Sequence, residues 1–397
     1  MLSPRSALWR IVSAAVLVGA GVACEQKAIV VLPRTSVNQT LFASYVALGN
    51  SITAGFQSGG ILDSTQAESY AAILAHQAGT RYAYAGLMPP GCPPPVVNFQ
   101  TGARLGGGTS TSCNLRDPAT ITSVLNNVAV PGAAAIDPTA ATSADANALT
   151  TFILGGKTQV QRALEANPTF VSIWIGNNDV LAAALSGFAF SQPTPVDSFF
   201  AQYDRMMSDL TTGAKGLKGM LIGVVDVTVI PSLFPVDSLI NDPTFKAEFN
   251  FAAGTNVPVN ANCNGAHALV SLEIIPAIQA GVVPPGVNCA TAAPFTLDTI
   301  KQAAVSQTVA AYNAHISGAA ATAGFAYLDV NPLLDTLKAH GAIYTLPNFL
   351  SATNPFGPFF TLDGVHPSAL AHEYLANAMI QTINAKYSVA IDTVAHP

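Results

Sequence analysis

Residues 42–51 read Phe-Ala-Ser-Tyr-Val-Ala-Leu-Gly-Asn-Ser, a short apolar run that ends in a polar turn. After a glycine-interrupted stretch, Tyr70 to Ala78 has the apolar spacing of a helix. The same order recurs at Phe170 to Ile175, an apolar run that ends in Gly-Asn-Asn-Asp and precedes an Ala/Leu-rich segment. The pattern of strand, turn and helix is therefore repeated along the chain.

Two further apolar runs, at 220–227 and 325–330, each follow a segment with helical spacing, at 198–217 and 299–323. Short apolar strands that alternate with helices are typical of a parallel sheet covered on both faces. We therefore predict an α/β protein with a doubly wound parallel sheet. In such a sheet, functional residues lie at the carboxyl ends of the strands.

The composition narrows the class of protein further. The chain has 397 residues, of which 50% are hydrophobic and only 10% are charged. The large hydrophobic fraction is enough to form a sizeable core, and it excludes intrinsic disorder as the main state of the chain. The 16 Lys and Arg face 22 Asp and Glu, and no basic run occurs. Binding to a phosphate backbone needs such a run, so the sequence argues against nucleic acid as a partner.

Residues 1–23 have the pattern of an export signal, with two arginines, no acid, and an apolar run over 11–22. That run is shorter than the ~20 residues of a membrane-spanning helix. Because small residues precede Cys24, the segment also resembles a bacterial lipoprotein signal, in which that cysteine carries the lipid. We expect an exported protein that is anchored to a membrane through Cys24, at the cell surface or in the periplasm, rather than freely secreted. Residues 24–40 are the predicted tether.

Four cysteines remain, Cys92, Cys113, Cys263 and Cys289. An even number in an exported chain predicts two disulfides with three possible connectivities, of which we favour the pairing of sequence neighbours. None has Cys-x-x-Cys spacing, which argues against a zinc or redox site. They fall in two stretches rich in Pro, Gly or Asn, near 85–120 and 231–295, which we predict to be disulfide-stapled insertions in one domain over 41–390. Such insertions form lids or binding loops, or only decorate the surface.

Two segments carry groups suited to nucleophilic catalysis. Ser51 lies where a strand gives way to a turn, which exposes its hydroxyl and lets its own peptide N–H donate to an oxyanion. Asp363 and His366 lie three residues apart in a loop rich in Gly and Pro. A histidine that removes a proton from serine needs a carboxylate to orient it, and one tight loop can present both. Taken singly, each segment is better explained as a turn or a helix cap.

Two further segments offer hydrogen-bond donors. Asn178, in Gly-Asn-Asn-Asp over 176–179, follows the most apolar strand, and a side-chain amide there can donate to an oxyanion. Gly132, in Asn-Val-Ala-Val-Pro-Gly-Ala over 127–133, can offer a bare backbone N–H.

In order, Gly-Asn-Ser at 49–51, the glycine block at 127–133, Gly-Asn-Asn-Asp at 176–179 and Asp-Gly-Val-His-Pro at 363–367 resemble the four sequence blocks of the SGNH, or GDSL, hydrolase superfamily. The resemblance covers Tyr45 to about His372 and implies the flavodoxin-like fold of these serine esterases and lipases. It implies Ser51 as nucleophile, His366 as general base and Asp363 as its orienting carboxylate. It also implies an oxyanion hole of the Ser51 and Gly132 N–H groups and the Asn178 amide.

The resemblance further implies an acyl-enzyme route that needs neither metal nor organic cofactor. The substrate would be a small-molecule ester or a lipid. The sequence departs from the family at one position, where Asn50 replaces the usual Asp before the serine. Because that residue is not the acid of the triad, we expect the change to tune the turn and to preserve activity. Apolar residues near the site loops favour a lipidic acyl group, namely Leu87, Met88, Phe99, Phe356, Phe359 and Phe360.

Three alternatives stay open at this stage. An acyltransferase would use the same triad, with a different acceptor. A non-catalytic lipoprotein would keep the fold and hold a ligand in the cleft. A metallohydrolase would use Asp363, His366, His372 and Glu373, although no recognised metal-binding spacing is present.

Overall fold

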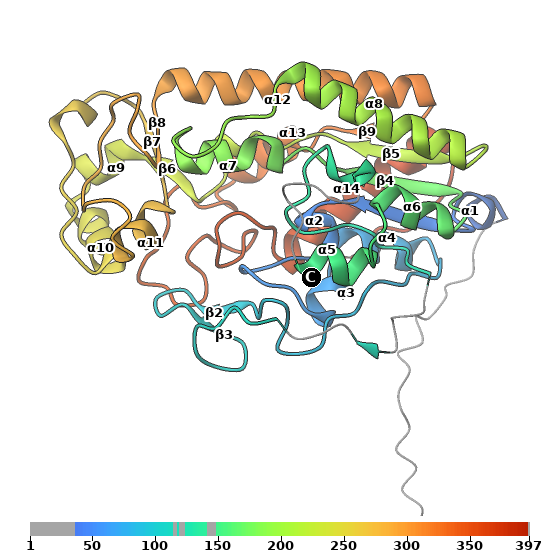
Figure 1. Cartoon of the computed structure of the whole chain (residues 1–397), viewed down its shortest axis with the longest axis horizontal. Helices are drawn as coiled ribbons and strands as arrows, with labels where there is room; N and C mark the ends of the chain where they lie inside the picture. The colour runs from blue at the N-terminus through green and yellow to red at the C-terminus, as the bar shows by residue number, and fades with distance from the viewer. Residues whose placement is uncertain (1–35, 114–116, 119–123, 141–147, 396–397) are drawn as a thin grey trace, which may run out of the picture.

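The computed structural model describes residues 36–113, 117–118, 124–140 and 148–395 (Figure 1). The predicted export signal, Cys24 and most of the predicted tether lie outside the described residues. The end of that tether, 36–40, belongs to helix α1 (Ser36–Leu41). Asn38 is buried, and its amide donates to the carbonyl of Ala390 at 2.9 Å. This part of the tether therefore packs against the C-terminal segment.

The predicted strands form one parallel sheet in the order β1 (Tyr45–Gly49), β4 (Phe170–Trp174), β5 (Lys218–Ile222) and β9 (Ala326–Leu328). On the other side of β1, Ala47 forms a single parallel bridge with Asn127. The chain thus passes from β1 first to one side and then to the other, which confirms the doubly wound prediction. The strand order reverses between β1 and β4, the position at which such sheets place their sites.

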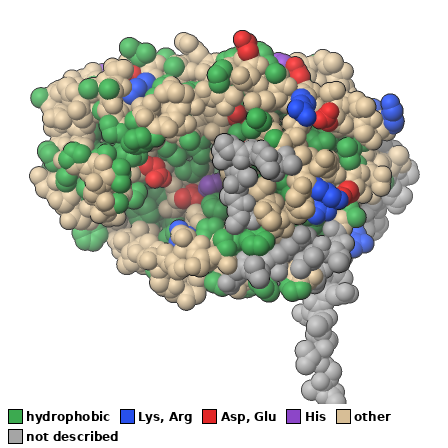
Figure 2. Space-filling model, viewed as in Figure 1, with side chains coloured by type: hydrophobic (Ala, Val, Ile, Leu, Met, Phe, Trp, Pro, Cys, Tyr) green, Lys and Arg blue, Asp and Glu red, His purple; other side chains and the backbone are tan. Residues whose placement is uncertain are grey.

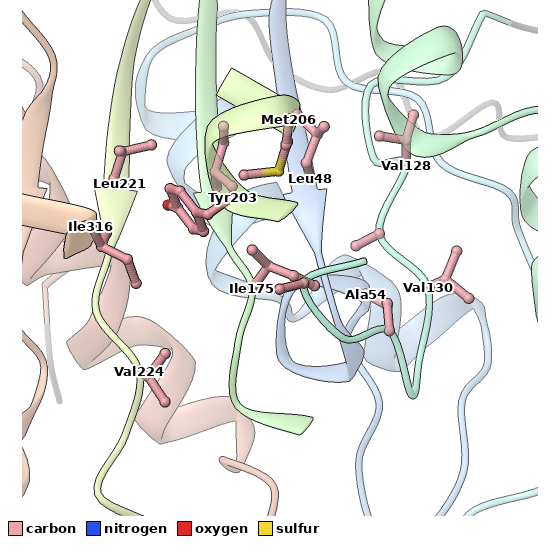
Figure 3. Close-up of a cluster of buried hydrophobic side chains, with 14 of the residues drawn as sticks. Leu48, Ala54, Val128, Val130, Ile175, Tyr203, Met206, Leu221, Val224 and Ile316 are labelled. Carbon is pink, nitrogen blue, oxygen red and sulfur yellow. The ribbon is translucent and has the colours of Figure 1, made fainter. Parts of the chain in front are cut away.

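Both faces of the sheet are buried, as its apolar runs predict. In β4, Phe170 and Trp174 pack toward α4 (Tyr70–Gln77) and α14 (Ala369–Tyr387), and Val171 and Ile173 pack toward the opposite layer. Figure 1 shows α8 (Val196–Gly213) and α12 (Thr299–Ala323) in that layer. Figure 3 shows side chains of α8 among strand residues of this core. The period of two along each strand therefore divides the side chains of the sheet between two cores, one on each face.

Shorter elements complete the main layers: α2 (Ser51–Ala54), α3 (Asp63–Ala67), α5 (Ala148–Leu154), α6 (Gln159–Glu165), α7 (Asn178–Ser186), α13 (Asn331–Ala339) and the 3₁₀ turns at Asp137–Thr139 and Val227–Val229. A further 3₁₀ turn, Ala261–Cys263, lies in the insertion near 231–295. Helix α12 covers the predicted segment 299–323, because Asp298 caps its start and Gly324 ends it in the left-handed conformation.

The insertion near 231–295 is more regular than its composition suggests. It contains α9 (Val236–Asn241), α10 (Pro243–Ala253) and α11 (Ile274–Gln279), and its strands β6 (Leu233–Pro235) and β7 (Leu269–Ser271) form an antiparallel sheet with β8 (Thr296–Leu297). Buried aromatic residues such as Phe234, Phe249 and Phe349 give it a core of its own. A local apolar core is what allows so many short elements between turn residues to form.

The described residues of the insertion near 85–120 have little regular structure, as predicted. Its antiparallel hairpin comprises β2 (Val96–Asn98) and β3 (Ala103–Arg104). Each insertion contains one disulfide between sequence neighbours, Cys92 to Cys113 and Cys263 to Cys289. These are the pairings favoured from the sequence.

On the face shown in Figure 2, charged side chains are few and lie scattered among hydrophobic and uncharged polar ones, in keeping with a charged fraction of 10%. Within the described ranges, no helix combines the length and the apolar character needed to cross a bilayer.

The two-core arrangement predicts different costs for two isoleucine truncations. Ile173 is fully buried between sheet and helices, so Ile173→Ala should lower the free energy of unfolding by about 2–5 kcal/mol. Ile300, which is 73% exposed at the start of α12, is the control, and Ile300→Ala should cost less than about 0.5 kcal/mol. Urea unfolding followed by tryptophan fluorescence measures both. Equal losses would contradict the assignment of Ile173 to the core.

Candidate active site

Ser51 begins helix α2 directly after β1. The side chain of Asn50 caps this helix by accepting a hydrogen bond from the Ile52 N–H at 3.1 Å. Gly49 is required for space, because a Cβ there would lie 2.4 Å from Thr53 Oγ1 and 2.5 Å from the Trp174 carbonyl oxygen. This tight turn holds the Ser51 hydroxyl at the carboxyl edge of the sheet.

His366 connects Ser51 to Asp363. Its Nε2 lies 2.8 Å from Ser51 Oγ, and its Nδ1 lies 2.8 Å from Asp363 Oδ2. The two segments are 315 positions apart in the sequence. The ring also packs against Phe56, with ring centroids 5.0 Å apart. Serine, histidine and aspartate therefore form the continuous hydrogen-bond relay that the sequence blocks imply.

The carboxylate of Asp363 is held by several donors. Burial would raise its pKa, but the nearby His366 charge and the hydrogen bonds from the His366 ring and from the backbone N–H groups of His366 and Val365 outweigh this and lower the pKa well below its ordinary value. Those two N–H groups lie 2.9 and 3.0 Å from Oδ1. Hydrogen bonds to the charged form favour that form. Asp363 thus stays ionised at neutral pH, as an orienting carboxylate must.

The sequence blocks imply three oxyanion donors, and the structure shows what each of these groups contacts. The N–H groups of Ser51 and Gly132 donate to no atom of the described residues. Gly132 has φ +88°, a left-handed conformation that glycine adopts readily. The Asn178 amide donates to the carbonyl of Ala133 at 2.8 Å, which ties it to the glycine block, and its second N–H hydrogen remains available. Ser51, Asn178 and His366 line one pocket.

That pocket is strongly apolar, and its cavity volume is about 70 Å³. Leucines of α13 and side chains of α14 form much of its wall. Of the apolar residues singled out from the sequence, Phe359 and Phe360 line it. Phe99 and Phe356 instead pack on each other with centroids 5.4 Å apart, Leu87 is buried in the core, and Met88 is exposed.

The residues of the metallohydrolase alternative do not form a metal site. His372 is fully buried in α14, and its Nδ1 accepts the Tyr70 N–H at 3.2 Å. Burial, and secondarily the His366 charge, lower the pKa of His372 to about 3, so that its ring stays neutral. In the part of the chain that the structure describes, no group of three His, Cys, Asp or Glu side chains is placed to hold a metal.

Three contacts of the site were not foreseen from the sequence. The buried Gln159 pairs with both backbone groups of Gly49, at 3.0 and 3.1 Å. Thr361 Oγ1 lies 3.1 Å from Asp363 Oδ1, and the Gly59 N–H donates to Asp363 Oδ2 at 2.7 Å. The Thr-x-Asp spacing at 361–363 is a local signal for the threonine. Gln159 and Gly59 are distant in sequence, so only the fold brings them to the site.

A parallel sheet with a Ser-His-Asp relay and free N–H donors at its carboxyl edge is the arrangement of serine-dependent acyl-transfer enzymes. The sequence pattern of the family described as GDSL-like Lipase/Acylhydrolase matches residues 45–379. The chain belongs to this family, which confirms the resemblance seen in the sequence. Membership supports hydrolysis of the esterase or lipase type in general.

Other comparisons add little. A solved structure titled "Crystal Structure of TesA" aligns over 86% of this chain and 98% of its own, at 12% sequence identity and a TM-score of 0.36. No curated protein matches the sequence significantly.

The lowered pKa of Asp363 has a consequence for stability. A carboxylate whose pKa is lower in the folded state stabilises the fold above its unfolded pKa of about 3.9, and this stabilisation is lost as the pH falls toward the folded value. Asp363→Asn should therefore destabilise the protein more at pH 7 than at pH 3. Urea unfolding of both proteins at the two pH values measures the difference. A gap that is the same at both would show that the charge of Asp363 does not stabilise the fold.

Proposed function

We propose that this protein is an exported serine esterase that cleaves carboxylic esters through an acyl-enzyme on Ser51. The observation that carries the proposal is the relay of two 2.8 Å hydrogen bonds from Ser51 Oγ through His366 to Asp363. A non-catalytic binding protein would have no need of this geometry, because the relay serves only to activate the hydroxyl.

The geometry supports a two-step reaction. His366 Nε2 accepts the Ser51 proton as the oxygen attacks the ester carbonyl, and Asp363 stabilises the resulting imidazolium. The N–H groups of Ser51 and Gly132 and the Asn178 amide stabilise the oxyanion, and one such donor contributes about 3 kcal/mol. His366 then gives the proton to the departing alcohol. Water, activated by the same histidine, releases the acid and restores Ser51.

The pocket beside Ser51 supports an apolar acyl group. Leu333, Leu334 and Leu337 of α13 and Leu375 of α14 line it, and none of its lining residues is a lysine, arginine, aspartate or glutamate. An alkyl chain gains roughly 0.8 kcal/mol for each CH₂ that it buries in such surroundings. We therefore propose esters of medium or long fatty acids as the substrate class.

Export and membrane attachment are part of the proposal. The sequence of residues 1–24 supports export with lipidation at Cys24. The two disulfides of the fold agree with an oxidising compartment, where such bonds form and persist.

Hydrolysis of p-nitrophenyl esters from acetate to palmitate tests this function. The protein should hydrolyse the series with an optimum at medium or long chains, because the pocket is apolar. Ser51→Ala should lower kcat by about 10⁴-fold or more and abolish labelling by a fluorophosphonate. Thr308→Ala, on the remote helix α12, is the control for the loss of a hydroxyl. Labelling of Ser51→Ala as fast as of the unchanged protein would refute the assignment of the nucleophile.

The departure at position 50 has its own test. Asn50 Oδ1 caps α2, and its buried Nδ2 donates to no described atom, so an aspartate can keep the cap and place its second oxygen there. Asn50→Asp should therefore change kcat by less than about tenfold. A hundredfold gain in kcat, about 2.7 kcal/mol of transition-state stabilisation, would show that Asn50 strongly lowers the activity of the site.

A further inference from the structure

Asp363 depends on a loop that lies far away in the sequence. Its Oδ2 accepts hydrogen bonds from the His366 ring and from the Gly59 N–H, the latter at 2.7 Å. The preceding residue, Ser58, donates its N–H to Thr361 Oγ1 at 2.9 Å and accepts the Leu362 N–H on its Oγ at 3.3 Å. The loop at 57–61 thus contacts the Asp363 segment through backbone and side chain.

This loop is in turn held by the insertion near 85–120. The Val96 N–H donates to the Ser58 carbonyl at 2.8 Å, and the Cys92 N–H donates to the Ile61 carbonyl at 2.8 Å. Gly60 packs directly on the proline backbone of the insertion, since a Cβ there would lie 2.4 Å from Pro95 N. Backbone hydrogen bonds and close backbone packing therefore join the loop at 57–61 to the insertion.

Arg104, in strand β3 of the insertion, reaches the same loop with its side chain. Its Nη1 donates to the Gly59 carbonyl at 2.9 Å and to the Pro94 carbonyl at 2.6 Å. Gly59 has φ +66°, and it is the residue whose N–H holds Asp363. The guanidinium of Arg104 therefore holds the carbonyl of Gly59, and the N–H of the same glycine holds the carboxylate of Asp363.

The insertion is itself constrained. The disulfide between Cys92 and Cys113 closes the segment that carries Arg104, which limits its freedom. The Leu105 N–H donates to the Pro95 carbonyl, and the Phe99 N–H donates to the Ala352 carbonyl, both at 2.8 Å. Arg104 thus belongs to a segment whose position is held by a disulfide and by backbone hydrogen bonds.

We infer that Arg104 is a positioning residue for the catalytic carboxylate: the disulfide-closed insertion, through Arg104 and Gly59, keeps Asp363 in place beside His366. The inference rests on the proposed function and goes beyond it, since it gives a role to a segment with no counterpart among the sequence blocks. No described residue of the insertion, and none of the loop at 57–61, lines the apolar pocket. Loss of Arg104 should therefore lower kcat and leave KM unchanged.

The test compares Arg104→Ala with a matched arginine elsewhere. Arg162 also holds a backbone carbonyl, that of Leu154 at 2.7 Å, but lies in α6, outside the contacts around Asp363. With the p-nitrophenyl ester of the best acyl-chain length, Arg104→Ala should lower kcat by about tenfold to a hundredfold with KM within about twofold, because a misplaced catalytic group costs this much. Arg162→Ala should match the unchanged protein, and Arg104→Lys should recover part of the loss.

A double-mutant cycle separates positioning from general destabilisation. If Arg104 acts through Asp363, Arg104→Ala should have no further effect on kcat once Asp363→Asn is present. An equal loss in both backgrounds, no loss in either, or a rise in KM in place of a fall in kcat would overturn the inference. If Arg104→Ala does not fold, as judged by thermal unfolding, the cycle is run with Arg104→Lys under the same criteria. An unchanged protein that neither hydrolyses esters nor reacts with a fluorophosphonate would overturn the proposed function itself.

Discussion

All strands of the central sheet run in one direction, and the site depends on this constraint. Two sequence blocks directly follow strand ends, Ser51 after β1 and Asn178 after β4, and β1 and β4 are neighbours. Their carboxyl ends therefore meet at one edge, where the strand order reverses. The glycine block joins them because Asn127 bridges to Ala47 in β1 and Val130 donates to the Gly49 carbonyl.

Asp363 and His366 follow no strand of the sheet and must be held by other means. They precede α14, which packs against α4 on the sheet face opposite α8 and α12. Backbone donors of their own loop and the Gly59 N–H then fix the carboxylate. The His366 charge and the hydrogen bonds to Asp363 lower its pKa, and the same hydrogen bonds also direct its oxygens. The site is therefore sensitive to the segments that support this loop.

Chemistry and substrate binding are assigned to different parts of the fold. The relay and the oxyanion donors occupy the sheet edge and its turns, whereas α13 and α14 form much of the apolar pocket. Helix α13 has no fully buried residue, and its three leucines line this pocket. Changes in α13 can alter which acyl group fits without disturbing the relay. In the proposed function, the sheet edge would therefore perform the same chemistry on esters with different acyl chains, and the pocket elements would determine the preference.

The sequence by itself determined the α/β class, the limits of α12 and the residues of the relay, because alternating apolar runs and four short blocks are local patterns. It also led to the favoured disulfide pairing, since each pair lies within 26 residues. It did not reveal the ordered core at 231–295, where Pro, Asn and Gly mask short helices and strands that only mutual burial stabilises. Nor did it reveal that Gly59 and Arg104 support Asp363. Those contacts join residues more than 40 positions apart, and in one case 304, through backbone groups that leave no trace in residue type. Only the tertiary structure determines these contacts. A hydrogen bond to a peptide group depends on where the backbone of that residue lies, and not on the type of its side chain.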